Sequence, residues 1–246
     1  MKKIVVIFGT RPEAIKMCPL VKELRTRENL ETLVCVTGQH RQMLDQVLET
    51  FHIQPDYDLD IMGKNQSLLD ITAKILEKFD PVVKEVHPDM ILVHGDTTTT
   101  FVASLVAFYN QVRIGHVEAG LRTFDKYSPF PEEMNRQMTD NLADLYFAPT
   151  SESKANLLME HHPESAIFIT GNTAIDALRL TVQEDYHHQV LDQLDPEKKL
   201  VLVTMHRREN QGQPMRAVFG ALREMVDAHP ELEVVYPVHL SPAVQE

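Results

Sequence analysis

Carboxylates, cations and histidines recur directly after predicted strands, where proteins with parallel sheets carry their chemistry. After a buried apolar run at 4–8 the chain reads Gly9-Thr10-Arg11-Pro12-Glu13-Ala14-Ile15-Lys16. Gly9 permits a tight turn, the following helix would offer free N–H groups, and Arg11 and Lys16 add cations. The pattern predicts a diphosphate cradle, although it is neither a Walker A loop nor GxGxxG. The alternative is an ordinary β–α turn with solvated cations.

Two carboxylates follow the next buried strands. Asp96 comes after His94-Gly95 at the end of residues 90–93, and Glu118 comes after His116-Val117. Carboxyl ends of neighbouring parallel strands meet at one edge of the sheet, so both carboxylates should converge on one crevice. Buried carboxylates usually have a task or a partner. The structural alternatives are that Asp96 caps a helix and that Glu118 forms a salt bridge with Arg122 or Arg136.

Three further motifs carry polar groups. Pro129 and Pro131 precede Glu132 and Glu133 at a predicted helix start, where acidic residues also suit the helix dipole. The run His206-Arg207-Arg208 follows a later strand and suits an anionic leaving group. After residues 33–36 come Gln39-His40-Arg41-Gln42, for which helix capping and surface polarity are the favoured explanation.

Two functions compete on these residues alone. In one, His94, Asp96, His116 and Glu118 bind a divalent metal and the protein is a hydrolase. In the other, the carboxylates are metal-free acid/base groups acting on a nucleotide-linked substrate. A glycine turn separates His94 from Asp96, which weakens the metal hypothesis.

The elements that must position these residues alternate almost without interruption. Apolar runs predict strands at 4–8, 33–36, 90–93, 113–117, 145–148, 166–170, 200–204 and 233–236. Helical spacing predicts helices at 12–24, 43–51, 68–79, 97–109, 132–142, 153–160, 173–183 and 215–228, with a capping box at Ser67–Asp70. This alternation predicts an α/β fold with a doubly wound parallel sheet covered by helices on both faces.

The polar stretch 185–198 divides the chain. We expect a Rossmann-like domain at 1–184, a join at 185–198 and the start of a second such domain at 199–246. A complete domain of this kind usually needs ~100–200 residues, so the second domain looks incomplete.

Composition narrows the class of protein. The net charge of −12 argues against a nucleic-acid partner, because such proteins carry basic patches. Cys18 and Cys35 have no CxxC or metal-ligand spacing and are expected to be buried core thiols. No stretch is apolar over ~18 residues, and the first apolar run is too short for a signal peptide, so we predict a cytoplasmic protein without a membrane span.

Taken together, the motifs resemble those of the non-hydrolysing UDP-N-acetylglucosamine 2-epimerases. No single motif is decisive, but six in order along the whole chain are specific. The matching segments are Gly9-Thr10-Arg11-Pro12-Glu13, Gly38-Gln39-His40, His94-Gly95-Asp96-Thr97, Val117-Glu118-Ala119-Gly120-Leu121-Arg122, Pro131-Glu132-Glu133 with Asn135-Arg136, and His206-Arg207-Arg208-Glu209-Asn210.

The resemblance implies a GT-B-like fold of two Rossmann-type domains with the active site in the cleft. It implies an isomerase that interconverts UDP-GlcNAc and UDP-ManNAc, without a cofactor or metal, as a homodimer in cell-envelope polysaccharide synthesis. The residues it assigns are, for catalysis, Asp96, Glu118, Glu132 and His206; for substrate binding, Arg11, Lys16, Asp96, Glu118, His206 and Arg136; and for an activating second UDP-GlcNAc, Gln39, Gln42, Arg207 and His239.

Two alternatives accompany the resemblance. A hydrolysing relative would release UDP and free ManNAc, and a fragment would bind the nucleotide sugar without turnover. Family members carry further nucleotide-binding motifs, including a Ser-Gly-Gly segment, beyond the point where this chain stops. The resemblance therefore implies that the chain corresponds to the N-terminal two-thirds of such a protein.

Overall fold

The structure, a computed structural model, describes residues 1–38, 41–63, 66–205, 210–238 and 242–245. These residues fall into two compact units, Met1–Val182 and Gln183–Glu246. The candidate carboxylates all belong to the first unit, so its sheet decides how they are placed.

A seven-stranded parallel sheet forms the centre of the first unit. Its spatial order is β3-β2-β1-β4-β5-β6-β7, with every neighbouring pair parallel. This order reverses direction between β1 and β4, which makes a crevice at the carboxyl ends of those strands. The strands are β1 Lys2–Phe8, β2 Leu30–Val36, β3 Tyr57–Asp58, β4 Met90–His94, β5 Arg113–Val117, β6 Leu145–Ala148 and β7 Ile167–Ile169.

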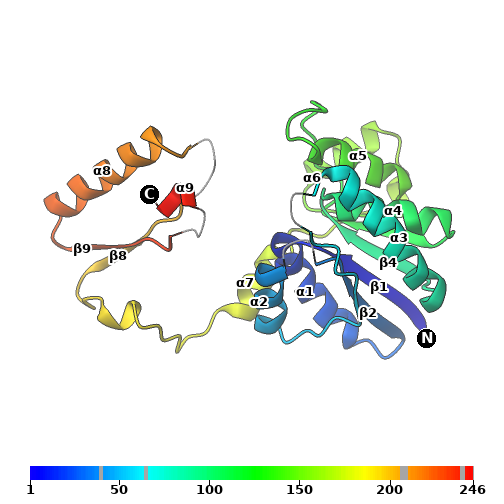
Figure 1. The fold of residues 1–246 in the computed structure, drawn as a ribbon, viewed down its shortest axis with the longest axis horizontal. Coiled ribbons are helices and arrows are strands. Elements are labelled where there is room, and N and C mark those ends of the chain that lie inside the picture. The colour runs from blue at the N-terminus through cyan, green and yellow to red at the C-terminus, as the bar shows by residue number, and fades with distance from the viewer. Residues whose placement is uncertain (39–40, 64–65, 206–209, 239–241, 246) are drawn as a thin grey trace. The chain divides into compact units, whose positions relative to one another are not determined.

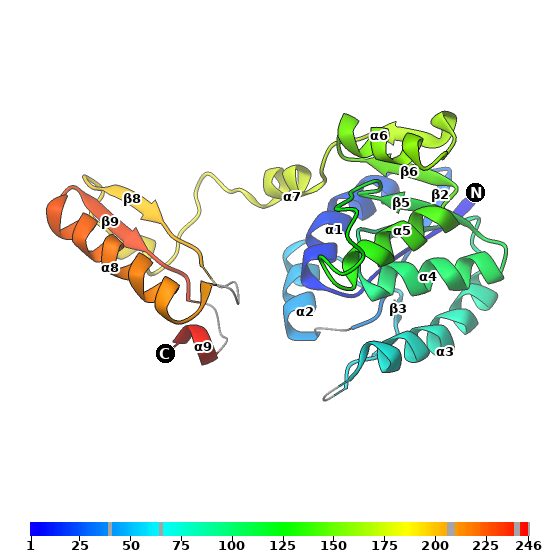
Figure 2. The same ribbon diagram turned by 90° about the horizontal axis from the view of Figure 1, so that it is seen from above.

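Helices connect the strands and cover both faces of the sheet (Figures 1 and 2). They are α1 Arg11–Arg25, α2 Arg41–Thr50, α3 Leu68–Val86, α4 Thr98–Tyr109, α5 Glu132–Leu142, α6 Ser151–Met159 and α7 Ala174–Thr181. The predicted doubly wound α/β fold is therefore confirmed. The sequence missed β3, whose two residues, Tyr57 and Asp58, are too few to show a periodic pattern.

Strand β1 is apolar at every position from Ile4 to Phe8 because both of its faces are buried. Alternate side chains of a strand point to opposite faces, and here both faces are covered. Ile4, Val6 and Phe8 join the core under α1 and α2. Val5 and Ile7 join the core under α3 and α4.

Helix starts follow local capping chemistry. The predicted capping box at α3 is present, because Ser67 Oγ accepts from the Asp70 N–H and the Asp70 carboxylate accepts from the Ser67 N–H. Helix α6 begins at Ser151, two residues before the predicted start, since Thr150 caps it by accepting from the Ser153 N–H. Cys18 and Cys35 are free and buried, as predicted.

The second unit contains a two-stranded parallel sheet. Strands β8 Lys199–Leu202 and β9 Leu232–Val235 pair, and helix α8 Gln213–Ala228 connects them. A short helix, α9 Pro242–Gln245, follows. The predicted strand at 200–204 ends two residues early.

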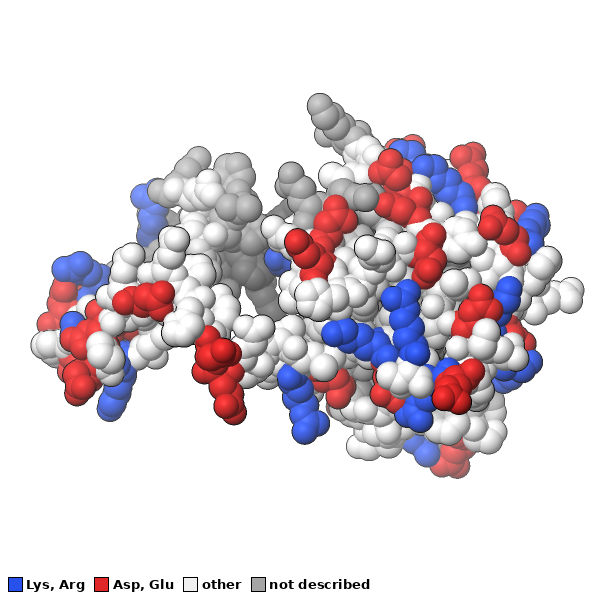
Figure 3. Space-filling model, turned by 90° about the horizontal axis from the view of Figure 1, so that it is seen from below, with Lys and Arg blue, Asp and Glu red and all other residues white. Residues whose placement is uncertain are grey.

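Surface charge and hydropathy agree with the composition. Figure 3 shows acidic and basic side chains interspersed over the face that it draws, without a continuous basic surface. Across the described ranges, no helix is both long and apolar enough to cross a membrane.

Candidate active site

A pocket lies at the carboxyl ends of β1, β4 and β5, where the strand order reverses. Its volume is about 210 Å³. The predicted residues Lys16, Asp96, Glu118 and Arg136 all line it. The complete lining is Thr10, Pro12, Glu13, Lys16, His94, Gly95, Asp96, Thr97, Glu118, Leu121 and Arg136.

Strand register brings the two carboxylates together. His94, the last residue of β4, pairs with Val117, the last residue of β5. Asp96 and Glu118 follow these paired residues by two and one positions, so both enter the same pocket. The predicted convergence of the two carboxylates is thus what the structure shows.

Glu118 occupies an unusual backbone conformation. Its φ of 67° lies in the left-handed region, which is unfavourable for residues other than glycine and clusters at functional sites. Lys16 Nζ donates to both carboxylate oxygens, at 2.8 and 2.5 Å. Burial raises the pKa of Glu118, but the neighbouring His94 and Lys16 outweigh burial and lower this pKa to about 2. Glu118 is therefore a fixed anion near neutral pH.

Asp96 is held by helix α5 and not by a helix start. Its Oδ2 accepts from Arg136 at 2.8 Å, and its backbone carbonyl accepts from Asn135 Nδ2 at 2.9 Å. Thr97, not Asp96, caps α4, so the capping alternative is wrong. The Asp96 side chain remains 33% exposed, which leaves one face of the carboxylate open to a ligand.

His94 lies beneath Glu118 and is 4% exposed. Its Nε2 is 2.8 Å from Glu118 Oε2. This close contact is one of the interactions that lower the pKa of Glu118, although neither ring nitrogen has a hydrogen-bond partner of good geometry among the described residues. His94 thus has donor capacity that the observed contacts do not use.

The turn after β1 differs from the predicted diphosphate cradle. Glu13, which is buried, accepts from the backbone N–H groups of Gly9 and Thr10 at 3.1 and 2.8 Å. A carboxylate therefore already occupies the N–H groups of Gly9 and Thr10, and Pro12 has none, so these three residues offer no free N–H group to a phosphate. Arg11 is exposed and does not line the pocket. Lys16 is the cation of this motif that does.

Glu13 also ties two turns together, a role that the sequence analysis missed. Its second oxygen accepts from Thr97 Oγ1 at 2.8 Å and from Thr100 Oγ1 at 3.3 Å. Glu13 therefore connects the β1–α1 turn to the start of α4. The sequence signals available for this contact were an acidic residue shortly after the first strand and a threonine-rich start of the helix that follows β4.

The two glutamates at the start of α5 have different roles. Glu133 is fully buried and accepts from the Thr123 and Phe124 N–H groups, at 3.1 and 3.0 Å. Burial raises the pKa of Glu133, but hydrogen bonds from Gln137 and from these N–H groups outweigh burial, so the pKa lies below its ordinary value. Glu132 is half-buried and does not line the pocket.

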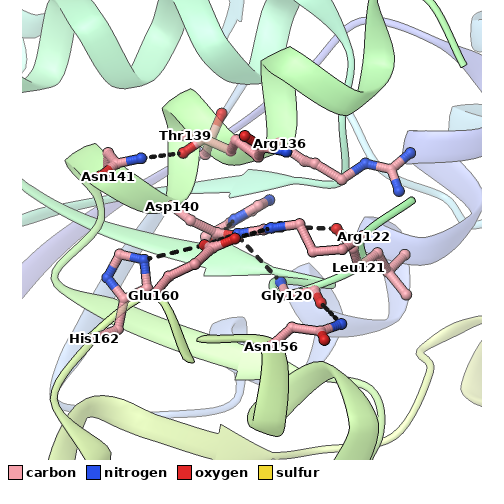
Figure 4. A network of polar contacts seen from close by, with 12 residues as sticks. Gly120, Leu121, Arg122, Arg136, Thr139, Asp140, Asn141, Asn156, Glu160 and His162 are labelled. Atoms are coloured by element: carbon pink, nitrogen blue, oxygen red, sulfur yellow. Dashed lines mark hydrogen bonds and ion pairs between the residues drawn. The ribbon is translucent and has the colours of Figure 1, made fainter. Parts of the chain in front are cut away.

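A buried polar network supports the ends of β4 and β5 (Figure 4). Asp140 Oδ1 lies 2.6 Å from His116 Nδ1, and the Gly95 carbonyl accepts from His116 Nε2 at 2.7 Å. Arg122 donates to Asp140 at 2.7 Å and to Glu160 at 2.5 and 2.7 Å. Burial raises the pKa of Asp140, but His116 and Arg122 lower it overall.

This network corrects two predictions. Glu118 pairs with Lys16, so the structural alternative of a salt bridge from Glu118 to Arg122 or Arg136 is wrong. His116 uses both ring nitrogens within the core and is not a pocket residue, unlike the other three residues of the metal hypothesis. In the described parts of the chain, no three His, Cys, Asp or Glu side chains are grouped as a metal ion would require.

Several predicted residues lie outside the described residues. These are Gln39, His206, Arg207 and His239. Gln42 belongs to α2, but its side chain is likewise outside the description. A separate groove of about 550 Å³ between α1 and α7 contains none of the predicted site residues.

Comparison with known proteins agrees with the fold and the motifs. A family model for UDP-N-acetylglucosamine 2-epimerase matches residues 22–246. A UDP-N-acetylglucosamine 2-epimerase of Bacillus subtilis (strain 168) is 58% identical over 244 residues, which are 99% of this chain and 64% of that protein. The chain therefore spans just under two thirds of that relative's length.

Solved structures give the same result. A crystal structure of a putative UDP-N-acetylglucosamine 2-epimerase from Listeria monocytogenes has a TM-score of 0.90 at 56% identity, covering 99% of this chain and 64% of that one. A UDP-GlcNAc 2-epimerase from Neisseria meningitidis, solved bound to UDP-GlcNAc, has a TM-score of 0.86 at 46% identity, covering 98% and 67%. These neighbours are GT-B-like, as the resemblance implied.

Proposed function

The chain belongs to the UDP-N-acetylglucosamine 2-epimerase family, and on that premise we propose that the protein interconverts UDP-GlcNAc and UDP-ManNAc without hydrolysis. The reaction would eliminate UDP to a glycal intermediate and then add UDP back. The observation that carries the proposal is the pocket itself, in which Glu118 and Asp96 lie beside the cations Lys16 and Arg136. Opposed charges of this kind suit a reaction in which charge separates.

The chemistry explains why both signs of charge are needed. The proton on sugar C2 is not acidic while UDP is attached, because no carbonyl is adjacent to it. When the C1–O bond breaks, the electron pair leaves with UDP and C1 becomes an oxocarbenium, which makes the C2 proton acidic. Fixed cations stabilise the departing diphosphate, and a base removes the proton to give the glycal.

Glu118 is best suited to stabilise the cationic ring. A carboxylate with a pKa of about 2 keeps its charge but is a weak base at neutral pH. Glycosidases use a carboxylate near the ring in the same way. Asp96, which lines the same pocket, and Glu132, which begins the helix carrying Arg136, are then the groups proposed to remove and return the proton.

Lys16, Arg136 and Arg11 are proposed to bind the substrate, with His206 acting on UDP as it leaves. The activating site at Gln39, Gln42, Arg207 and His239, the homodimer and the place in polysaccharide synthesis stay predictions from the resemblance. None of them is needed for the chemistry of the pocket.

Deuterium incorporation tests the reaction. The full-length protein is incubated with UDP-GlcNAc in D₂O, and the products are analysed by NMR and mass spectrometry. UDP-ManNAc with deuterium at C2 is expected, because the proton removed at C2 exchanges with solvent. Free ManNAc with UDP would instead identify a hydrolysing enzyme, and absence of both exchange and turnover contradicts the proposal.

The same assay tests the carboxylates. Asp96→Asn keeps the side-chain shape but removes the basic oxygen, so turnover should fall by ~10²- to 10⁴-fold. Asp80→Asn, a control on the surface of α3 where Asp80 pairs with Lys84, should keep full activity. Unchanged turnover in folded Asp96→Asn would show that this carboxylate is not part of the reaction.

A further inference from the structure

Three side chains from separate parts of the fold surround the Glu118 carboxylate. Lys16 of α1 bonds both oxygens, and the exposed Asn172 donates to Oε1 at 3.3 Å. His94, at the end of β4, approaches Oε2 to 2.8 Å from the buried side. Lys16 and Asn172 are partly or fully exposed, whereas the backbone of His94 belongs to the sheet and its side chain is buried.

The His94 ring has no ordinary structural explanation. Its backbone is well held, since the carbonyl accepts from Thr100 Oγ1 at 2.5 Å and the strand pairs with β5. Its two ring nitrogens are nevertheless buried without an aligned partner among the described residues. Burying an unpaired polar ring is unfavourable, so packing alone would favour an apolar residue here. His116, one strand away and equally buried, has both ring nitrogens bonded.

Lys16 cannot serve two anions equally. In the proposed reaction Lys16 binds the diphosphate, yet its ammonium now bonds both oxygens of Glu118. When phosphate oxygens recruit the ammonium, Glu118 loses Lys16 and keeps only Asn172, at 3.3 Å, and His94 as neighbours within a largely buried pocket. A carboxylate left without a donor there would be costly.

The other charged residues of the pocket are already engaged. Arg136 of α5 bonds Asp96, and Glu13 of α1 accepts from four donors. His94 is the remaining charged or ionisable neighbour in the pocket lining, and a small rotation would direct its N–H at Glu118.

We propose that His94 is a positioning residue that takes over the Glu118 carboxylate when Lys16 turns to the diphosphate of the substrate. This inference rests on the proposed function. It adds a division of labour between two donors: Lys16 bonds both oxygens of Glu118 in the empty site, and His94 becomes the main partner of Glu118 in the loaded one. The strained backbone of Glu118 then keeps the carboxylate between them.

Kinetics of three variants of the full-length protein test the role. His94→Phe keeps the ring shape without a donor, so kcat should fall ~100-fold with an unchanged KM, because Lys16 still binds the diphosphate. His94→Gln keeps an N–H donor and should recover part of the loss. His187→Phe, a control whose side chain is 83% exposed and lies outside the pocket lining, should keep full activity.

Two kinetic results would overturn the inference. One is a wild-type kcat in His94→Phe. The other is an equal kcat loss in folded His94→Gln and His94→Phe, which would indicate ring shape alone. If His94→Phe does not fold, a comparison of His94→Gln with wild type, together with the spectroscopic test, decides the matter.

NMR of the His94 ring tests the transfer without any turnover. Lys16→Met mimics the departure of the ammonium, so the His94 Nε2–H signal should move downfield as it bonds Glu118. The double variant Lys16→Met with Glu118→Gln should not show this shift. No change in Lys16→Met overturns the inference even if the protein is an epimerase. A clear shift in a protein that fails the deuterium test would contradict only the proposed function.

Discussion

At the scale of the residue, Glu118 combines a left-handed backbone, a buried carboxylate and two cationic or ionisable neighbours. The left-handed backbone and the burial of the charge are each unfavourable for a glutamate, whereas the two neighbours are favourable. Together they fix one orientation and one charge state, because the Lys16 and His94 contacts compensate for the burial of the anion.

Acid titration of stability measures this compensation. The pKa of Glu118 is about 2 in the fold against an ordinary value of 4.5, so its contribution is full above pH 4.5 and is lost as the pH falls towards 2. Urea unfolding between pH 5 and 2.5 should show wild type losing on the order of 2 kcal/mol more than Glu118→Gln.

The control for this titration is Glu164→Gln. Glu164 pairs with Lys154 at the surface, where water screens the pair, so its profile should follow that of wild type. Parallel profiles for wild type and Glu118→Gln would mean that the Glu118 pKa is not lowered in the fold.

At the scale of the element, Gly120 shows how closely α6 approaches the end of β5. Its φ is +83°, and a Cβ added there would lie 2.3 Å from the Ser153 carbonyl oxygen. Gly171 also has a positive φ, of +76°, but a Cβ there would meet nothing within 4 Å. A substitution at Gly171 therefore measures backbone strain alone, whereas one at Gly120 measures backbone strain together with steric overlap.

Alanine at both positions tests this distinction. For Gly171→Ala the unfolding free energy should fall by only about 1 kcal/mol, which is the cost of a left-handed backbone for alanine. For Gly120→Ala the unfolding free energy should fall by a further ~1–3 kcal/mol, because α6 must move away from the turn. Chemical denaturation measures both, and equal losses would contradict the close approach.

Arg122 connects α5 with the end of α6, because it forms ion pairs with both Asp140 and Glu160 (Figure 4). Arg122→Met fills similar space but leaves both carboxylates without their cation, so unfolding free energy should fall by ~3–5 kcal/mol. Lys154→Met removes an exposed partner of Glu164 on α6 and should cost ~0–1 kcal/mol. If the two substitutions cost the same, the network does not stabilise the helices.

At the scale of the whole molecule, the chain divides into two units that each have their own sheet, and residues 183–198 of the second unit precede its first strand. Most of this stretch is exposed, and a single short 3₁₀ helix, Leu191–Gln193, lies within it. We expect limited proteolysis to cut there first, because few backbone groups are protected by burial or by a regular element.

Mass spectrometry identifies the product of this digestion. A resistant fragment close to residues 1–182 is expected, since this unit has its own apolar cores on both faces of the sheet. Early cleavage within α3, α4 or α5 would show instead that the first unit does not hold together by itself.

The sequence predicted well what depends on short-range pattern. Apolar runs such as 4–8 and 145–148, and the capping box at Ser67, specify their elements through side-chain period and local hydrogen bonds. Parallel βα alternation then requires Asp96 and Glu118 to follow adjacent strands. These expectations needed no knowledge of distant contacts.

The tertiary structure alone decided which distant side chains pair in the pocket, because several donors compete for each carboxylate and the chosen partners lie far apart in the chain. It paired Glu118 with Lys16, 102 residues away, and Asp96 with Arg136, 40 residues away. The sequence by itself therefore determined that carboxylates and cations gather at the ends of β1, β4 and β5. Only folding decided which of them remain available to a substrate, since burial and competition between charges depend on the packed geometry.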